Sequence, residues 1–559
     1  MKKKSSITLI VIIAIVAFAV AAFMIFCPCS KDKEPGRAEI NEPYFGYINL
    51  EQLATKGAFD RYFDANNRKM LASMASANIE DKAMADHATA IITDFSASGL
   101  NIKQPAYGYV DAKDNGVVII EVADIEKVDK SIELLSYLGT KNNSLPINIQ
   151  RNGDDRIVEL DGFMLGYNTS RLAVVFNEYG EALNDVLIDA LQRPLTDLSL
   201  FGDADIATYV HFGKILENTR DKLEEQKAES LKLIETDPDG AYYYTRKIEE
   251  IDAVLTQFDD FAQYTNENSY GIVALTFDAG RATIDTYSPE TDSLPTKDIT
   301  KLVNNKHLSY IDATAPIVAN LGLNGEKFVE FADLFLQSSY FLESEYNTND
   351  INMVIAVARD VFKSIDGDLT IAVENLEGSY KSYYGRAGLK NAAATIMVDV
   401  KDEYIISNLG QFAGSFLRRQ DSTHYSGGFG GFNITLGQDD NVFHAGINSP
   451  YVVRTESADT AAWFNDVEES YGYLVVDVEN LMNCSYIAAA NQALVSDMDS
   501  ESADVYNKFV DICDYVYMSQ SAPTAGELVI VLDDKQTNAL QQIADIVMPI
   551  IVRELFANM

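Results

Sequence analysis

The sequence predicts an α+β fold in which one unit occurs twice, and three observations lead to that prediction. Short runs of β-friendly residues follow one another between turn signals, and helical segments fall in separate blocks. The chain has 559 residues, more than one hydrophobic core usually organises, so we expect several domains. An eight-residue pattern, which we call the repeated phrase, also occurs four times, as residues 47–54, 209–216, 310–317 and 475–482.

The repeated phrase predicts a strand that runs directly into a helix. Its copies read YINLEQLA, YVHFGKIL, YIDATAPI and VVDVENLM, and the third position holds Asn49, His211, Asp312 or Asp477. Asn and Asp are favoured N-caps because their side-chain oxygens accept free backbone N–H groups of the first helical turn. Gln52, three residues after Asn49, completes a capping box, whereas His211 is the poorest cap of the four.

The spacing of the copies predicts a tandem duplication. Asn49 and Asp312 are 263 residues apart, and His211 and Asp477 are 266 residues apart. Three echoes recur in the same order: LGYNTS (165–170) with AGINSP (445–450), GIVALTFD (271–278) with GELVIVLD (526–533), and VAD (122–124) with VKD (400–402). We therefore predict two repeat units, 43–290 and 305–559, joined by a linker at 287–297.

Each unit is expected to contain antiparallel strand meanders with packed helices. Turn signals such as Asn152-Gly153-Asp154 separate the predicted strands. These strands are 104–112, 116–124, 161–168 and 171–176 in the first unit, and 368–375, 393–400, 432–438, 441–448 and 451–456 in the second. The predicted helices are 124–138, 182–192, 326–342 and 458–470. The Gly-rich stretch 424–433 lacks the context of a phosphate loop, and we expect it to form a flexible loop.

A helical hairpin is expected in each unit. Residues 213–262 have many opposite charges three or four positions apart, with a break at DPDG (237–240). A shorter hairpin is expected within 477–533, with its turn at DMDSE (497–501).

The N-terminus predicts a membrane anchor. Residues 7–26 contain no charge, Gly or Pro, and twenty helical residues span about 30 Å, the thickness of a bilayer core. Lys2, Lys3 and Lys4 place that end in the cytoplasm and the rest of the chain outside it. Residues 1–42 are therefore expected to be an anchor followed by a disordered polar tether.

Two alternatives to the anchor remain open. In a lipoprotein, Cys27 or Cys29 would carry the lipid, although lipoprotein signals place a small residue before the Cys and this chain has Phe26 and Pro28. Simple secretion is the second alternative, and apolar residues that continue past Ala19 make a poor cleavage site. All three interpretations place the body of the protein outside the cytoplasm, in the periplasm or at the cell surface.

The charge of the chain limits its partners. The formal net charge is −40 at pH 7, and binding to phosphate backbones needs Lys/Arg patches, so we expect no nucleic-acid partner. The expected contact with the membrane is the anchor, and the other partner is an unidentified protein or envelope polymer.

The search for catalytic and metal motifs is negative. The five histidines, His87, His211, His307, His424 and His444, show no metal-ligand spacing, and the chain has no nucleophile elbow, Walker loop or dinucleotide fingerprint. We therefore expect no catalytic residue, no metal site and no cofactor.

Cys484 and Cys513 form a candidate disulfide. Both lie in the second predicted hairpin at equal distances from its turn, so antiparallel helices would place them at the same height. A disulfide can form outside the cytoplasm if the two Cα atoms lie within about 7 Å. Two buried thiols that pack without bonding are the alternative.

The start of the folded part resembles a known family. NEPYFGYINLEQLATKGAFD, ASGLNIKQPAYGYVDA and GVVIIEVADIEKVDKSIELL, after a membrane-targeting N-terminus, are similar to the bacterial envelope family of domain of unknown function 4836. The resemblance covers most of the chain after the tether. It implies an extracytoplasmic location, usually through a lipidated Cys, and it implies no activity and no functional residues.

Two hypotheses for the function follow. The first is a non-enzymatic, membrane-anchored binding or scaffold protein of the bacterial envelope. The second is a hydrolase of envelope polymers that uses an unrecognised carboxylate pair, which two adjacent buried carboxylates in a deep cleft would favour.

We predict that residues from about 40 onward lie outside the cytoplasm, because Lys2–Lys4 retain the N-terminus inside. Protease added to cells with a permeabilised outer layer should degrade the body of the protein. Full protection of the C-terminal half would contradict this topology.

Overall fold

A computed structural model describes residues 40–558 except 78, 142–147, 161, 178–182, 195, 197, 238–239, 263–268, 289–297, 337–348, 382–385, 415–416, 430 and 524. The predicted anchor at 7–26, Cys27, Cys29 and most of the predicted linker lie outside these residues.

The described residues divide into two compact units. The N-terminal unit contains residues up to 218, 270–284 and 534 onward, and the C-terminal unit contains 219–269 and 285–533. The two units interleave along the sequence, and the predicted repeat boundaries at 43–290 and 305–559 remain a prediction.

The first strand set, β1–β10, is antiparallel throughout the pairs whose register is defined. Its strands are β1 Tyr44–Ile48, β2 Ala106–Val110, β3 Gly116–Glu121, β4 Ile149–Asn152, β5 Asp155–Leu160, β6 Phe163–Tyr167, β7 Arg171–Phe176, β8 Ile206–His211, β9 Tyr270–Asp278 and β10 Arg281–Tyr287. Their order across the sheet is β10-β9-β8-β1-β2-β3-β7-β6-β5-β4.

The second strand set, β11–β20, is also antiparallel. Its strands are β11 Ile317–Asn324, β12 Ile365–Lys381, β13 Arg386–Val400, β14 Arg418–Arg419, β15 His424–Phe429, β16 Phe432–Asp439, β17 Val442–Ile447, β18 Gly472–Asp477, β19 Cys513–Ala522 and β20 Ala525–Leu532. Their order is β20-β19-β18-β11-β12-β13-β17-β16-β15-β14. Adding ten to each strand number of the first set reproduces the order of the second set. The two sets therefore share one strand order.

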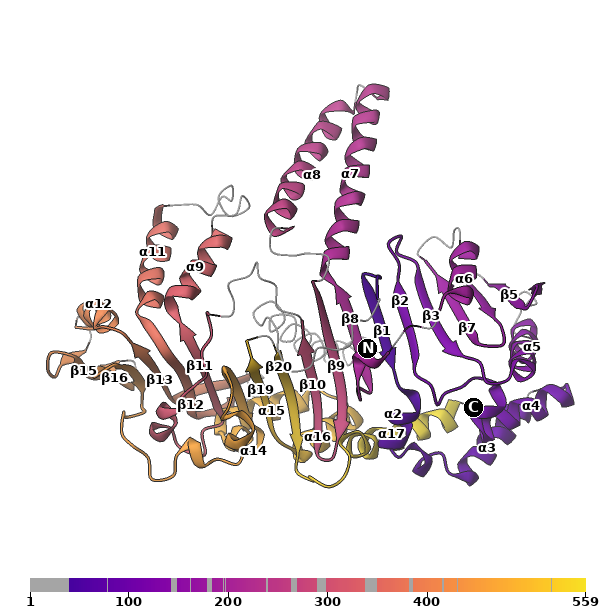
Figure 1. Ribbon diagram of the computed structural model, residues 1–559. Coiled ribbons are helices and arrows are strands. Elements are labelled where there is room, and N and C mark those ends of the chain that lie inside the picture. Colours follow the sequence, from indigo (N-terminus) through magenta and orange to yellow (C-terminus); the bar gives the residue numbers. More distant parts are fainter. Residues whose placement is uncertain are drawn as a thin grey trace. The chain divides into compact units, whose positions relative to one another are not determined.

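The helices of the N-terminal unit connect and cover its strands (Figure 1). They are α2 Leu50–Lys56, α3 Ala65–Ala77, α4 Lys82–Thr93, α5 Ile125–Lys141, α6 Leu183–Gln192 and α17 Ala539–Asn558, with short 3-10 turns η1 Phe59–Arg61, η2 Phe95–Ser98 and η3 Ser199–Phe201. Helix α6 packs on β6 and β7, and α5 packs on the other face of these strands in an apolar cluster with Val158, Tyr167 and Leu172.

The helices of the C-terminal unit are η4 Lys306–Tyr310, α9 Gly325–Leu336, α11 Asn349–Lys363, α12 Tyr404–Ala413, η6 Ala458–Thr460, α13 Phe464–Val467, α14 Val478–Asn483, α15 Ser485–Ser496 and α16 Ser500–Ile512. Helix α12 contacts β15 and β16 on one face of the sheet. On the other face, η4, η6 and α13 cover the main core around Met397 and Trp463, which are at most 1% exposed.

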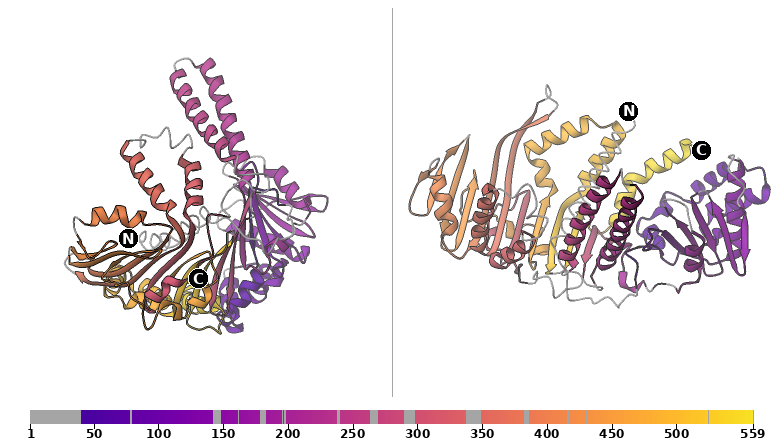
Figure 2. Two further views of the ribbon diagram at one scale, coloured as in Figure 1. Left: turned by 60° about the vertical axis from the view of Figure 1, so that its left-hand side comes forward. Right: turned by 90° about the horizontal axis from the view of Figure 1, so that it is seen from above.

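The predicted hairpin at 213–262 is present as α7 Phe212–Thr236 and α8 Ala241–Ala262. The two helices run side by side in both views (Figure 1, Figure 2). Ion pairs Lys227–Asp252 and Arg220–Asp259 join them.

The repeated phrase marks a strand-to-helix step in three of its four copies. The side chains of Asn49, His211 and Asp477 accept the backbone N–H of Gln52, Lys214 and Asn480 at 3.0, 3.2 and 2.8 Å.

The prediction for residues 310–317 is wrong. Asp312 follows η4 and accepts the N–H of Thr314, in a turn that precedes β11. Asn324, at the end of β11, occupies the equivalent position instead and accepts the N–H of Lys327 at 3.3 Å.

Three local predictions for the second unit are also wrong. The Gly-rich stretch 424–433 contains β15 and the start of β16 rather than a flexible loop, and 458–470 contains only η6 and the four-residue α13. Residues 451–456 form no strand, because Arg454 donates its backbone N–H to Ser309 and its Nε–H to Tyr310. This segment is therefore tied to η4.

We predict that Gly322→Ala in β11 destabilises the protein by about 1–3 kcal/mol, the range for overpacked sites. A Cβ on Gly322 would lie 2.0 Å from the carbonyl oxygen of Lys301, whose backbone N–H donates to Gly322. Equilibrium denaturation of the full chain in detergent measures the effect. Gly428→Ala is the matched control, since its Cβ would meet nothing nearer than 3.8 Å. Equal effects of the two substitutions would contradict the packing argument.

Candidate functional site

A row of aligned side chains crosses seven strands of the second set. The directly paired residues are Tyr473 (β18), Asn320 (β11), Thr370 (β12), Met397 (β13), His444 (β17), Gly437 (β16) and His424 (β15). Directly paired residues share one face of a sheet. We call these seven residues the polar row. Asp368, Asp399 and Asp439 lie on the same face, two residues along their strands from members of the row.

Hydrogen bonds connect one half of the polar row to the segment before β11. Tyr473 and Asn320 both donate to the side-chain oxygen of Asn305, at 2.9 and 3.1 Å. The hydroxyl of Thr370 donates to the side-chain oxygen of Asn320 at 2.9 Å. Asn320 and Thr370 are at most 1% exposed, so these bonds satisfy groups that would otherwise be costly to bury.

His307 belongs to η4, and its ring contacts side chains of β12 and β13. Its Nδ1 lies 2.8 Å from the Thr370 hydroxyl, and its Nε2 lies 3.0 Å from Oδ1 of Asp399. The proton of the Thr370 hydroxyl is already donated to Asn320, and a carboxylate only accepts. The Nε2–H of His307 therefore donates a hydrogen bond to Asp399.

Asp399 is the buried carboxylate that accepts this hydrogen bond. It also pairs with Lys306 at 2.6 Å and accepts the backbone N–H of Asp368 at 3.2 Å. Burial acts to raise the pKa of Asp399, but the hydrogen bonds from His307 and Lys306 outweigh it and lower the pKa from 3.8 to about 2.

Asp368, which is fully buried, holds the same segment at its other end. Its carboxylate accepts the backbone N–H groups of Asn304 and Asn305 at 2.9–3.2 Å. The two carboxylates thus fix the segment 304–307 on β12 and β13.

Three stacked rings lie beside this segment. Tyr310 stacks on Tyr451 with ring centroids 4.3 Å apart and an angle of 3°, and Tyr451 stacks on His444 at 3.9 Å and 7°. The stack joins η4, the segment after β17, and the polar row.

A pocket of about 820 Å³ opens next to the stack. It is lined by Lys306, His307, Ser309, Tyr310, Asp439, Asp440, Asn441, Val442, Tyr451, Val452 and Val453. Its volume is within the usual range for small-molecule sites, and the lining combines aromatic and aliphatic surface with a few polar groups.

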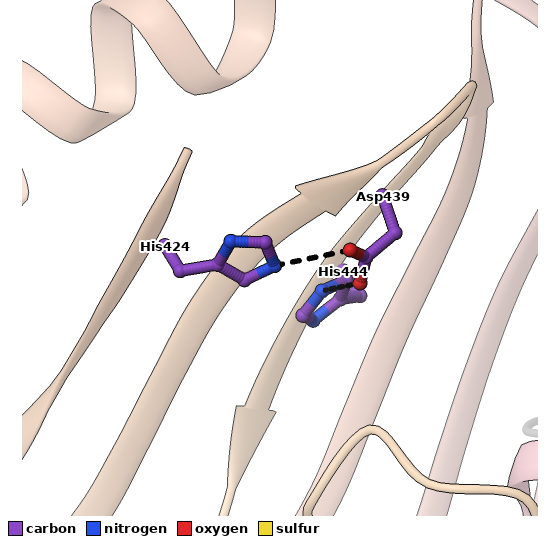
Figure 3. Close-up of side chains that lie close together, drawn as sticks. All are labelled: His424, Asp439 and His444. Carbon is purple, nitrogen blue, oxygen red and sulfur yellow. Dashed lines mark hydrogen bonds and ion pairs between the residues drawn. The ribbon is translucent and has the colours of Figure 1, made fainter. Parts of the chain in front are cut away.

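His424, Asp439 and His444 form a cluster (Figure 3), and Asp439 also lines the pocket. The Nε2 atoms of His424 and His444 lie 3.3 and 3.2 Å from the two carboxylate oxygens of Asp439. One potential ligand atom from each residue lies within 4.8 Å of the others, so the cluster could hold a metal ion.

The two histidines differ in their electrostatic environments. Burial lowers the pKa of His444, against the attraction of Asp439. Burial also acts to lower the pKa of His424, but hydrogen bonds to Asp421 and Asp439 prevail and raise it.

Gly437 makes room for the two rings. A Cβ at this position would lie 2.5 Å from Cδ2 of His424 and 2.7 Å from Nε2 of His444. Glycine, which has no side chain, is therefore required between the two imidazole rings.

The first strand set uses the equivalent positions for an apolar core. When the β6–β7 and β16–β17 turns are aligned, Gly437 corresponds to Gly166, whose neighbours across the sheet are Ile157 and Ala173. A Cβ on Gly166 would collide with Leu187 and Leu191 of α6. In the second set, the corresponding connection between β17 and β18 has the short helices η6 and α13 in place of a helix like α6, and the histidines occupy this face.

A family model described as Domain of unknown function (DUF4836) matches residues 44–540. The chain belongs to this family. The match spans every described strand of both sets, and it confirms the resemblance found at the start of the folded part. No curated protein and no solved structure matches the chain.

In this DUF4836 protein, the absence of linear metal motifs concealed the cluster. His424 and His444 come together with Asp439 only through strand pairing, while His87 contacts Ser131 and His211 caps α7. The turn signal at Asp440-Asn441 could have shown that residues 439 and 444 flank one hairpin. It could not have placed His424 beside them.

Cys484 and Cys513 are free thiols in the structure. Cys484 directly precedes α15 and Cys513 directly follows α16, but α15 packs against β12 and β13. Burial and the charge of Asp533 raise the pKa of Cys513 to about 11, which disfavours its thiolate. The disulfide remains a prediction.

Across the part of the chain that the structure describes, no helix combines the length and the apolarity needed to cross a bilayer.

We predict that Asp399→Asn lowers the free energy of unfolding by about 2–3 kcal/mol at pH 7, the equivalent of a pKa shift of nearly two units. The pKa of Asp399 is lower in the folded state, so its contribution is complete above about pH 4 and is lost as the pH falls towards 2. The difference between wild type and variant should therefore shrink below pH 4 in denaturation experiments.

Asp366→Asn is the control, because the Asp366–Lys301 pair is solvent-exposed and should contribute less than about 1 kcal/mol. A difference for Asp399→Asn that stays constant from pH 7 to pH 3 would contradict the electrostatic account.

Proposed function

We propose that this protein is a membrane-anchored, extracytoplasmic protein of the bacterial envelope that binds a glycan fragment in the pocket beside Tyr310 and Tyr451. Residues 7–26 would anchor it, with Lys2–Lys4 on the cytoplasmic side. The observation that carries the binding function is the pocket itself, with its aromatic stack and polar lining.

The lining suits a sugar ring in chemical terms. A sugar ring has apolar C–H faces and a rim of hydroxyls, and the pocket offers tyrosine rings together with donors and acceptors from Lys306, Asp440 and Asn441. Buried hydrogen bonds and ion pairs fix η4, so Tyr310 is held in place before a ligand arrives.

The second hypothesis, hydrolysis by a carboxylate pair, has less support. Asp368 and Asp399 are buried and adjacent, but both accept hydrogen bonds that fix the segment 304–307. A general acid needs a raised pKa, whereas the pKa of Asp399 is lowered to about 2. This arrangement favours a positioning role for the pair over proton transfer.

A tandem duplication would explain why the site occurs in one strand set. The shared strand order supports it, as does the correspondence of LGYN (165–168) with LGQD (436–439) at equivalent turns. In this proposal, the first copy keeps an apolar face beneath α6 and the second copy carries the binding site.

We predict that Tyr451→Ala weakens glycan binding at least tenfold, because it removes the central ring of the stack. The probe is a soluble disaccharide–peptide fragment of peptidoglycan, titrated calorimetrically into the full chain in detergent. Tyr243→Ala is the control, since this tyrosine on α8 is 66% exposed and should leave binding unchanged.

Wild-type protein that does not bind the fragment, or a Tyr451→Ala variant that binds it equally well, would refute the proposal. Mass spectrometry of the fragment after incubation tests the alternative. Cleavage by wild type that is lost in Asp399→Asn would favour the hydrolase.

A further inference from the structure

We propose that His424, Asp439 and His444 bind a divalent transition-metal ion of the zinc class at the edge of the pocket. Two imidazoles and a carboxylate are a common ligand set for such ions. The proposal concerns a different ligand from the glycan and does not depend on glycan binding.

The spacing of the ligand atoms fits a metal ion. Zinc–nitrogen and zinc–oxygen bonds of about 2.0–2.2 Å in tetrahedral geometry separate the ligand atoms by about 3.3–3.5 Å. Nε2 of His424 lies 3.3 Å from Oδ1 of Asp439, and Nε2 of His444 lies 3.2 Å from Oδ2. One ligand atom from each of the three residues lies within 4.8 Å of the other two. A metal ion could therefore replace the protons of these hydrogen bonds with small movements of the side chains.

Asp421 holds His424 in the orientation that a ligand requires. Its Oδ1 lies 2.9 Å from Nδ1 of His424 and accepts the proton there, which leaves Nε2 to face Asp439. A carboxylate on the far nitrogen of a ligating histidine is the usual support in metal sites, since it fixes the tautomer and the ring. Asp421 is thus a positioning residue.

His444 is fixed by other means. Its ring is 5% exposed and stacks on Tyr451, and Gly437 leaves the space that both imidazoles occupy. The equivalent residues of the first strand set are apolar, which shows that this face of the fold does not itself need histidines.

The position left open by three protein ligands would face the pocket. Asp439 belongs both to the cluster and to the pocket lining, and its side chain is 51% exposed. Water or an oxygen atom of a pocket ligand could complete the coordination of the ion.

The test is zinc binding by the full chain in detergent, measured by equilibrium dialysis and elemental analysis. Cys27 and Cys29 could also bind zinc, so the site is read as the difference between wild type and variants. We expect His424→Gln and His444→Gln each to lose one zinc per chain. Asp421→Asn should keep the zinc with 10–100-fold lower affinity. Gly437→Ala should also weaken binding, although every ligand remains.

His87→Ala is the matched control. His87 and its neighbour Ser131 both belong to the N-terminal unit, whereas the cluster belongs to the C-terminal unit, so this variant should not change zinc binding. Cobalt gives a second readout: wild type should show the visible absorption of four-coordinate Co²⁺, and His424→Gln should not. The proposal is overturned if the double variant His424→Gln/His444→Gln binds as much zinc as wild type. It is also overturned if His87→Ala loses as much as either variant.

Discussion

The buried carboxylate of Asp399 is the group on which the site depends. It pairs with Lys306 and His307, and it accepts the backbone N–H of Asp368, which in turn holds Asn304 and Asn305. These bonds fix the segment that leads into η4, and η4 supplies Tyr310 to the aromatic stack. Because the stack ends on His444, the pocket wall and the histidine cluster share one support.

The two strand sets show how one sheet order can serve two purposes. In the first set, α6 covers the face that contains Ile157, Gly166 and Ala173, and the result is an apolar core. In the second set, the same positions hold His424, Gly437 and His444. Both sets have a glycine at this position, and each places bulky side chains over that point of the sheet.

Local signals predicted much of the fold, while the site depended on pairing between distant strands. N-caps and turn signals predicted the strand-to-helix steps at Asn49 and Asp477 and the hairpin α7–α8. The similar segments VAD (122–124) and VKD (400–402) also lie at corresponding places, directly after β3 and at the end of β13. The predicted correspondence of Gly166 with Gly446 is wrong. LGYN at the end of β6 and LGQD at the end of β16 both precede a hairpin turn, whereas AGIN lies at the end of β17, after the turn. His424 and His444 are twenty residues apart in sequence, and only the register of β15, β16 and β17 brings them together.

The central claim is that the face with the polar row is a functional site built on the second strand set. Anomalous X-ray diffraction at the zinc absorption edge, from crystals of the protein grown with zinc, tests it most directly. The account predicts an anomalous peak about 2 Å from Nε2 of His424, Nε2 of His444 and a carboxylate oxygen of Asp439. Fully occupied zinc elsewhere on the protein, with no peak among these three side chains, would contradict it.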